Sequence, residues 1–238
     1  MEPAHRHIFI MPADGGTAFQ LTEGNYNHYG SLAWTVDSKE IYLSDYRSND
    51  WELVSDEADI YAVNIDTKEL KQITSEPGAE RSPSISPNGK TLAFIKEERR
   101  PLAYTPDRIA IVNVDGGKSR LLTKNLDGDA NDIIWADDNR SIYFAYDERG
   151  IRKVGQVNLN GSIKEIVSGL GGTSLGRPYL SGGFHMSANT IAFTYGKPDR
   201  PSNVAIVKNG KPLALTALND DLLGYKTVSY THLTLPTI

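Results

Sequence analysis

The chain has 238 residues, of which 39% are hydrophobic and 23% charged, and its formal net charge is −5 at pH 7. These proportions are ordinary for a globular protein, and the negative charge argues against a nucleic-acid surface, which needs clustered Lys and Arg. The absence of cysteine excludes disulfides and thiolate zinc sites, and no apolar run approaches the roughly 18 residues of a membrane span, so we expect a cytoplasmic protein without nucleic-acid or membrane partners.

The first predicted element is a hairpin over residues 7–22, in which two strands flank the turn Asp14-Gly15-Gly16. Segments of the same pattern, each closing on Thr or Ser fifteen positions after its start, recur at 59–74, 108–123 and 153–168, and a copy two residues shorter spans 203–216. Four of the five turns contain Asp-Gly or Asn-Gly, which supply the positive φ that tight hairpins require. The pattern therefore predicts a series of β-hairpins.

A second kind of segment lies between these hairpins and consists of an apolar anchor, a polar turn and an alternating apolar strand. The anchors are Trp34, Ile85, Trp135 and Phe184, which stand 51, 50 and 49 residues apart. Two hairpins that recur together about every fifty residues are typical of a four-stranded β-propeller blade. A β-sandwich would lack this long period, and no amphipathic helix of a dozen residues is evident, so the predicted fold is all-β.

The repeats predict about four and a half blades, which is an incomplete ring. We expect a half blade at 5–24 and full blades at 25–75, 76–124, 125–170 and 171–217, all within one partial propeller over residues 1–228. A cut ring would expose strand edges. Residues 229–238, SYTHLTLPTI, continue no repeat and are predicted to be a non-native tail; a native C-terminal strand is the alternative.

Several stretches carry a family resemblance: SPSISPNGKTLAF (82–94), IVNVDGGKSRLLT (111–123), LDGDANDIIWADDNRSIYF (126–144), and IAFTYGKPDRPSNVAIV (191–207) followed by LTALNDDLLG (215–224). With these stretches the chain resembles the N-terminal propeller of the prolyl oligopeptidase family of serine peptidases, in particular its acylaminoacyl-peptidase-like and dipeptidyl-peptidase-like branch. The resemblance implies an α/β-hydrolase domain after the propeller, with Ser, Asp and His in that order, and no cofactor. The chain ends before such a domain, so we expect a catalytically silent fragment that gates peptide substrates in its parent and contacts the missing hydrolase domain.

A free-standing protein-interaction propeller, TolB-like or WD-repeat-like, is the alternative, because Tol-system propellers share the SPNGKTLAF-type turn. A propeller glycosidase or lactonase is a weaker alternative, since no paired carboxylates or metal ligands recur at equivalent blade positions.

The stretch GTSLG at 172–176 matches the G-x-S-x-G pattern of a nucleophile elbow. An elbow needs a strand before the serine and a helix after it. A glycine-rich loop precedes Ser174, and Pro178 cannot lie inside a helix that begins there. The possible partners, Asp199 and His232, lie in a turn and in the suspect tail. We therefore interpret Ser174 as part of an inter-blade loop and predict no catalytic residue.

Two long insertions within blades, residues 45–52 and 96–108, are the candidate contact sites, because long loops tend to carry function. Arg and aromatic side chains suit contacts with a peptide or a partner domain. The candidates for substrate or partner contact are Arg99, Arg100, Tyr104, Trp51 and Glu52. A solvated loop is the alternative.

No metal site is predicted. His5 and His7 could supply two zinc ligands, but a site needs three or four. The acidic run at 127–132 resembles a loose calcium loop, but its twelfth position is Asp138 where an EF-hand has a bidentate Glu. Asp and Asn also favour turns, so we interpret this run as an inter-blade loop.

Overall fold

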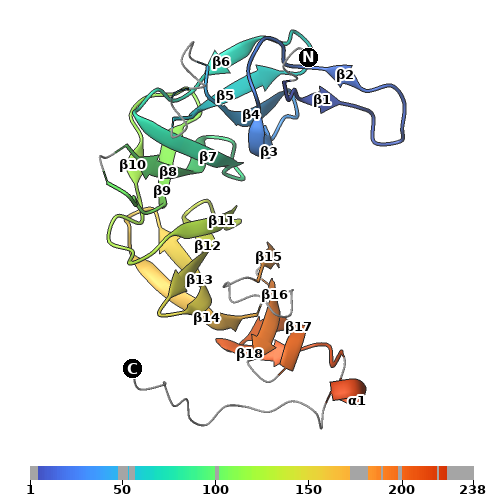
Figure 1. The fold of residues 1–238 in the computed structure, drawn as a ribbon, viewed down its shortest axis with the longest axis vertical. Coiled ribbons are helices and arrows are strands. Elements are labelled where there is room, and N and C mark those ends of the chain that lie inside the picture. The colour runs from blue at the N-terminus through green and yellow to red at the C-terminus, as the bar shows by residue number, and fades with distance from the viewer. Residues whose placement is uncertain are drawn as a thin grey trace, which may run out of the picture. The chain divides into compact units, whose positions relative to one another are not determined.

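The computed structural model describes residues 5–47, 53, 57–99, 102–171, 182–188, 190–197, 200–218 and 220–223 (Figure 1). The chain divides into two compact units, Met1–Phe144 with Gln156–Lys164, and Ala145–Gly155 with Glu165–Ile238. Apart from the helix α1 (Asp220–Leu223), the regular elements in these residues are antiparallel β-strands. No helix in the described ranges is long and apolar enough to cross a membrane.

The first unit opens with a two-stranded hairpin and two four-stranded sheets, in which neighbours in sequence pair with each other. The hairpin consists of β1 (Phe9–Ile10) and β2 (Phe19–Gln20). The first sheet consists of β3 (Tyr29–Trp34), β4 (Glu40–Asp45), β5 (Asp59–Asn64) and β6 (Leu70–Gln72). The second consists of β7 (Gly78–Ile85), β8 (Thr91–Glu98), β9 (Arg108–Asn113) and β10 (Arg120–Leu121).

The apolar core lies on both faces of the β3–β6 sheet, because successive side chains of a strand point to opposite faces. One cluster joins this sheet to the β1–β2 hairpin and contains Ile8, Leu21, Ile41, Leu43, Tyr61 and Val63. The other joins it to the β7–β10 sheet and contains Tyr42, Ile60, Ala62, Ile73, Leu92, Phe94, Ala110 and Val112. Burial on both faces explains why β4 and β5 are nearly continuous apolar runs.

Whereas the hairpin at 153–168 closes on Ser168, the threonine that closes the other four predicted hairpins has a structural role. Its hydroxyl oxygen accepts a hydrogen bond from a backbone amide in the first strand of the same hairpin, which fastens the two ends together. The bonds run from the amides of Ile8, Ile60, Ile109 and Val204 to Thr22, Thr74, Thr123 and Thr216, at 2.9, 2.8, 2.9 and 2.9 Å. Three of these threonines are buried. The recurrence of Thr in the sequence therefore reflects one repeated hydrogen bond.

The remaining strands form one continuous sheet. It contains β11 (Ala130–Trp135), β12 (Ser141–Glu148), β13 (Ile151–Asn158) and β14 (Ile163–Leu170), followed by β16 (Thr190–Lys197), β17 (Arg200–Lys208) and β18 (Lys211–Ala214), with β15 (Phe184–Ser187) paired to β16. The join is the pairing of Leu170 with Tyr195. Glycine permits it, since a Cβ on Gly171 would lie 2.1 Å from the amide nitrogen of Gly196.

The prediction of an all-β fold with four-stranded antiparallel units is confirmed by the β3–β6 and β7–β10 sheets. The predicted turn chemistry is also present. Asn209 and Gly210, between β17 and β18, have φ of 53° and 71°, which are the two positive values of a tight hairpin turn. The fusion of the later strands into one sheet was not predicted, because it depends on a backbone contact between residues distant in sequence. The blade boundaries, the blade count and the nature of residues 229–238 stay predictions.

Candidate functional site

The insertion between β8 and β9 holds three of the predicted contact residues, and the two that the structure describes, Arg99 and Tyr104, pair with carboxylates. The hydroxyl of Tyr104 donates to Oδ1 of Asp129 at 2.6 Å, and this hydrogen bond raises the pKa of Tyr104 to about 12. The same oxygen accepts the amide of Asp107 at 2.9 Å. Nη1 of Arg99 lies 3.0 Å from Oε1 of Glu57. The structure therefore anchors Arg99 and Tyr104 to different carboxylates, although both residues remain exposed.

The other predicted contacts, Trp51, Glu52 and Arg100, lie outside the described residues, and so does Ser174. The acidic run at 127–132 is engaged in the structure: Asp129 receives Tyr104 and the Asp107 amide, which fastens the insertion to this loop. Among the residues that the structure describes, no three His, Asp or Glu side chains are grouped so that they could hold a metal ion.

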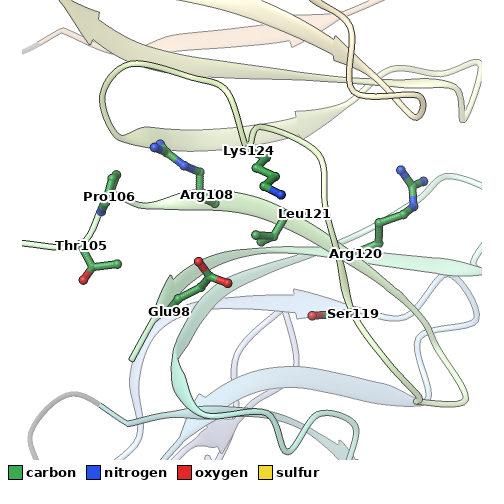
Figure 2. A pocket seen from close by; sticks show the side chains of 8 residues that line it. All are labelled: Glu98, Thr105, Pro106, Arg108, Ser119, Arg120, Leu121 and Lys124. Carbon is green, nitrogen blue, oxygen red and sulfur yellow. The ribbon is translucent and has the colours of Figure 1, made fainter. Parts of the chain in front are cut away.

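An open pocket of about 540 Å³ lies beside the same insertion. Its walls come from the end of β8, from the insertion with the start of β9, and from β10 with the residues around it (Figure 2). It is lined by Glu98, Thr105, Pro106, Arg108, Ser119, Arg120, Leu121 and Lys124. This volume is within the usual range of small-ligand sites, about 300–1,000 Å³.

Main-chain carbonyls orient the two arginines of the pocket. Nη1 of Arg108 donates to the carbonyl oxygens of Gly128, at 2.5 Å, and Asp107, at 3.3 Å. Nη1 of Arg120 donates to the carbonyl oxygen of Leu159 at 2.7 Å. Because carbonyl groups carry no net charge, these bonds fix the guanidinium groups without neutralising them. The arrangement can therefore present positive charge to a ligand.

A buried ionic cluster adjoins the pocket. Nζ of Lys96 lies 2.8 Å from Oε1 of the fully buried Glu80 and also contacts Glu76. Ser119, which lines the pocket, donates its amide to Glu76 at 3.0 Å and its hydroxyl at 2.5 Å. Burial raises the pKa of Glu80. Burial alone would lower the pKa of Lys96, but the hydrogen bonds that Lys96 donates to Glu76 and Glu80 outweigh this effect and raise that pKa.

A second buried charged group lies at the end of β4. Nδ1 of His28 is 3.3 Å from Oδ2 of Asp45, and Nε of Arg47 donates to the same oxygen at 2.7 Å. Burial lowers the pKa of His28, so its ring is neutral at pH 7. The ring of His7 lies 5.8 Å from that of His28. This group links the N-terminal hairpin to the first sheet, and its Arg47 also lines a small open pocket together with Leu21 and Leu70.

A family model described as the dipeptidyl peptidase IV N-terminal region matches residues 4–99. This part of the chain is similar to that region. Dipeptidyl-peptidase 5 of Porphyromonas gingivalis is 26% identical over 177 residues, which are 68% of this chain and 26% of that protein. The chain is thus a distant homologue of this member of the prolyl oligopeptidase family and spans about a quarter of its length.

Solved structures similar to this chain are β-propellers. Oligogalacturonate lyase in complex with manganese matches with a TM-score of 0.67 at 14% identity, over 88% of this chain and 59% of the lyase. TolB from Acinetobacter baumannii matches with a TM-score of 0.60 at 22% identity, over 87% of this chain and 48% of TolB. Similarity at these identities shows the fold and nothing of the activity, and the propeller prediction is confirmed.

Sequence reasoning found the insertion but not the pocket residues. Loop length identifies an unusual segment, whereas the pocket needs Ser119, Arg120 and Lys124, about twenty residues further on. One signal was available: Lys96 continues the apolar series Leu92 and Phe94 on one face of β8. A charged residue at a core position of a strand indicates a buried partner of opposite charge.

Proposed function

We propose that this chain is the substrate-gating propeller region of a serine peptidase of the prolyl oligopeptidase family, and that it is catalytically silent by itself. The observation that carries the proposal is the match of residues 4–99 to the dipeptidyl peptidase IV N-terminal region. The 26% identity to dipeptidyl-peptidase 5 over 177 residues supports it across more of the chain. Peptides would be the substrates of the parent, and an α/β-hydrolase domain would be the partner of the propeller.

Catalytic silence of this chain requires that it contain no nucleophile elbow. A nucleophile elbow places the serine between a strand and the helix that directly follows it. In the described residues, successive strands are joined by turns and loops, and α1, with the sequence DDLL, contains no serine. We expect the catalytic Ser, His and Asp to be supplied by another part of the parent.

Two experiments test the proposal. The purified chain is incubated with a fluorophosphonate probe and with dipeptidyl p-nitroanilides; we expect neither label nor product, and labelling of Ser174 would contradict catalytic silence. The source DNA is then sequenced from codon 215 onward. A frame that continues past Thr227 into a domain with strand-G-x-S-x-G-helix followed by Asp and His supports the peptidase.

The gating role needs the longer protein. We expect the protein expressed from such a frame to hydrolyse dipeptidyl p-nitroanilides and unfolded peptides but not a folded protein of the same cleavage sequence. Equal hydrolysis of the folded protein would contradict gating.

A free-standing interaction propeller is the second candidate, and the similarity in fold to TolB favours it. It is distinguished by the same DNA sequence, because a scaffold needs no hydrolase domain. The cytoplasmic location stays a proposal for either candidate, to be checked by cell fractionation.

A further inference from the structure

The pocket beside the β8–β9 insertion carries an excess of positive charge. Arg108, Arg120 and Lys124 are cationic, and Glu98 is the single acidic residue that lines it. The nearest carboxylate in sequence to Arg108 belongs to Asp107, and it binds Nη2 of Arg81 at 2.5 Å instead. Lys124 is exposed and forms no ion pair within the described part of the chain. The positive charge of the pocket is therefore available to a ligand.

The remaining lining indicates the size and kind of that ligand. Pro106 and Leu121 supply apolar surface and Thr105 brings a hydroxyl group, whereas the hydroxyl of Ser119 is bound to Glu76. In the view of Figure 2, the amino group of Lys124 and the carboxylate of Glu98 point toward each other, and the guanidinium groups of Arg108 and Arg120 point outward on opposite sides of them. A volume of about 540 Å³ holds more than one small inorganic anion. Several separated cations and apolar surface suit a chain that carries several carboxylates.

We propose that this pocket binds an acidic peptide, an extended segment with two or more Asp or Glu side chains. Arginine recognises carboxylates through paired N–H groups, and Arg108 and Arg120 are already held in place by the carbonyls of Gly128 and Leu159. Lys124, which is exposed, adds a third cation. The prior fixing of the two guanidinium groups lowers the entropic cost of binding. This site is independent of the gating proposal, because it lies at the outer hairpin β9–β10 and needs no hydrolase domain.

The test is fluorescence anisotropy of a labelled tetraglutamate peptide, titrated with the purified chain at low ionic strength. We expect saturable binding that weakens with added salt, and no binding of a tetraglutamine peptide. Lys124→Gln should weaken binding about fivefold, equivalent to one ion pair of about 1 kcal/mol. Lys124→Glu should weaken it further, since it places a negative charge in the pocket.

The matched control is Lys118→Gln, which removes the same charge from the same hairpin at an exposed position that does not line the pocket. We expect unchanged affinity for this variant. Equal weakening by Lys118→Gln and Lys124→Gln would overturn the proposal, because it would indicate attraction to the hairpin in general. Binding of inorganic phosphate but not of tetraglutamate, with the same dependence on Lys124, would also overturn it in favour of a small-anion site. Thermal unfolding of each variant verifies that the exposed substitutions leave the fold intact.

Discussion

Nε1 of Trp135 donates a hydrogen bond to the carbonyl oxygen of Ser84, 3.0 Å away. Trp135 ends β11 and Ser84 lies in β7, so the bond ties equivalent strands of two successive repeats together. Trp34 occupies the same position of an earlier repeat, yet it is 46% exposed where Trp135 is 6% exposed. The element before β3 is only the two-stranded β1–β2 hairpin. Tryptophan at the same repeat position is therefore a buried, hydrogen-bonded core residue in one repeat and a half-exposed residue in another.

This pair gives the first prediction. Trp135→Ala should lower the free energy of unfolding by about 3–5 kcal/mol, because it leaves a cavity and an unpaired carbonyl at Ser84. Trp34→Ala should cost only about 1 kcal/mol, since half of that residue is already in water. Urea denaturation followed by circular dichroism measures both. If the two variants lost similar amounts of unfolding free energy, the contribution of each tryptophan to stability would depend on its repeat position and not on the observed burial.

The closing threonines give a second prediction. Thr123 is fully buried and its hydroxyl accepts the amide of Ile109. Thr123→Val keeps the shape but leaves that buried amide without a partner, which should cost about 1–3 kcal/mol of unfolding free energy. Thr123→Ser keeps the hydroxyl and should recover most of the loss. If the serine variant is as unstable as the valine variant, the methyl group and not the hydrogen bond explains the threonine.

Much of the fold could be predicted from the sequence, because each repeat contains its own local signals. Turn pairs such as Asn209-Gly210 and the closing threonines act within a single hairpin, so their spacing is visible in one dimension. The join between Leu170 and Tyr195 could not be predicted, because it depends on how closely the backbones of Gly171 and Gly196 approach. That approach depends on the tertiary structure, and no local sequence pattern indicates it.

The site was less predictable for the same physical reason. Loop length identifies residues 96–108 as an unusual segment, but it cannot say which side chains face a cavity. Arg99 and Tyr104 are candidates for substrate or partner contact because Arg and aromatic side chains suit such contacts. In the structure they pair with Glu57 and Asp129. Lys124 lies in a short segment without any unusual feature. Its place in the pocket follows from the pairing of β10 with β9, which sequence alone does not position.

The buried cluster around Lys96 leads to the third prediction. Lys96→Met leaves Glu80, which is fully buried, without its counter-ion. Breaking a buried ion pair in this way should cost about 3–5 kcal/mol of unfolding free energy. Lys96→Met combined with Glu80→Gln removes both charges and should recover a substantial part of the loss.

The control for this cluster is Lys90→Met, at an exposed turn between β7 and β8. It should change stability by less than about 0.5 kcal/mol. The three variants are compared by urea denaturation at pH 7. A double variant that is no more stable than Lys96→Met alone would contradict the assignment of the cost to the unpaired Glu80.

The fourth prediction concerns pH. Burial, and then the negative charge of Glu80, raise the pKa of Asp59 from 3.8 to about 6, although Gln72 donates to its Oδ2 at 2.9 Å. Because the folded state holds this proton more tightly than the unfolded state, the contribution of Asp59 to stability is complete below pH 3.8. It is lost as the pH rises through 6. Glu57 adds to the shift and Lys96 opposes it.

Asp59→Asn removes this titration and retains an oxygen that can accept the hydrogen bond from Gln72. We therefore expect the variant to be more stable than the native chain at pH 7.5, and the difference to shrink as the pH falls to 5. Unfolding free energies of both proteins are measured at several pH values between 5 and 7.5. Groups that do not interact with Asp59, such as His28, titrate equally in both proteins, so their contributions cancel in the difference. A difference that stays constant over the range would mean that Asp59 keeps its ordinary pKa, and that its carboxylate is better solvated than its position beside Glu80 implies.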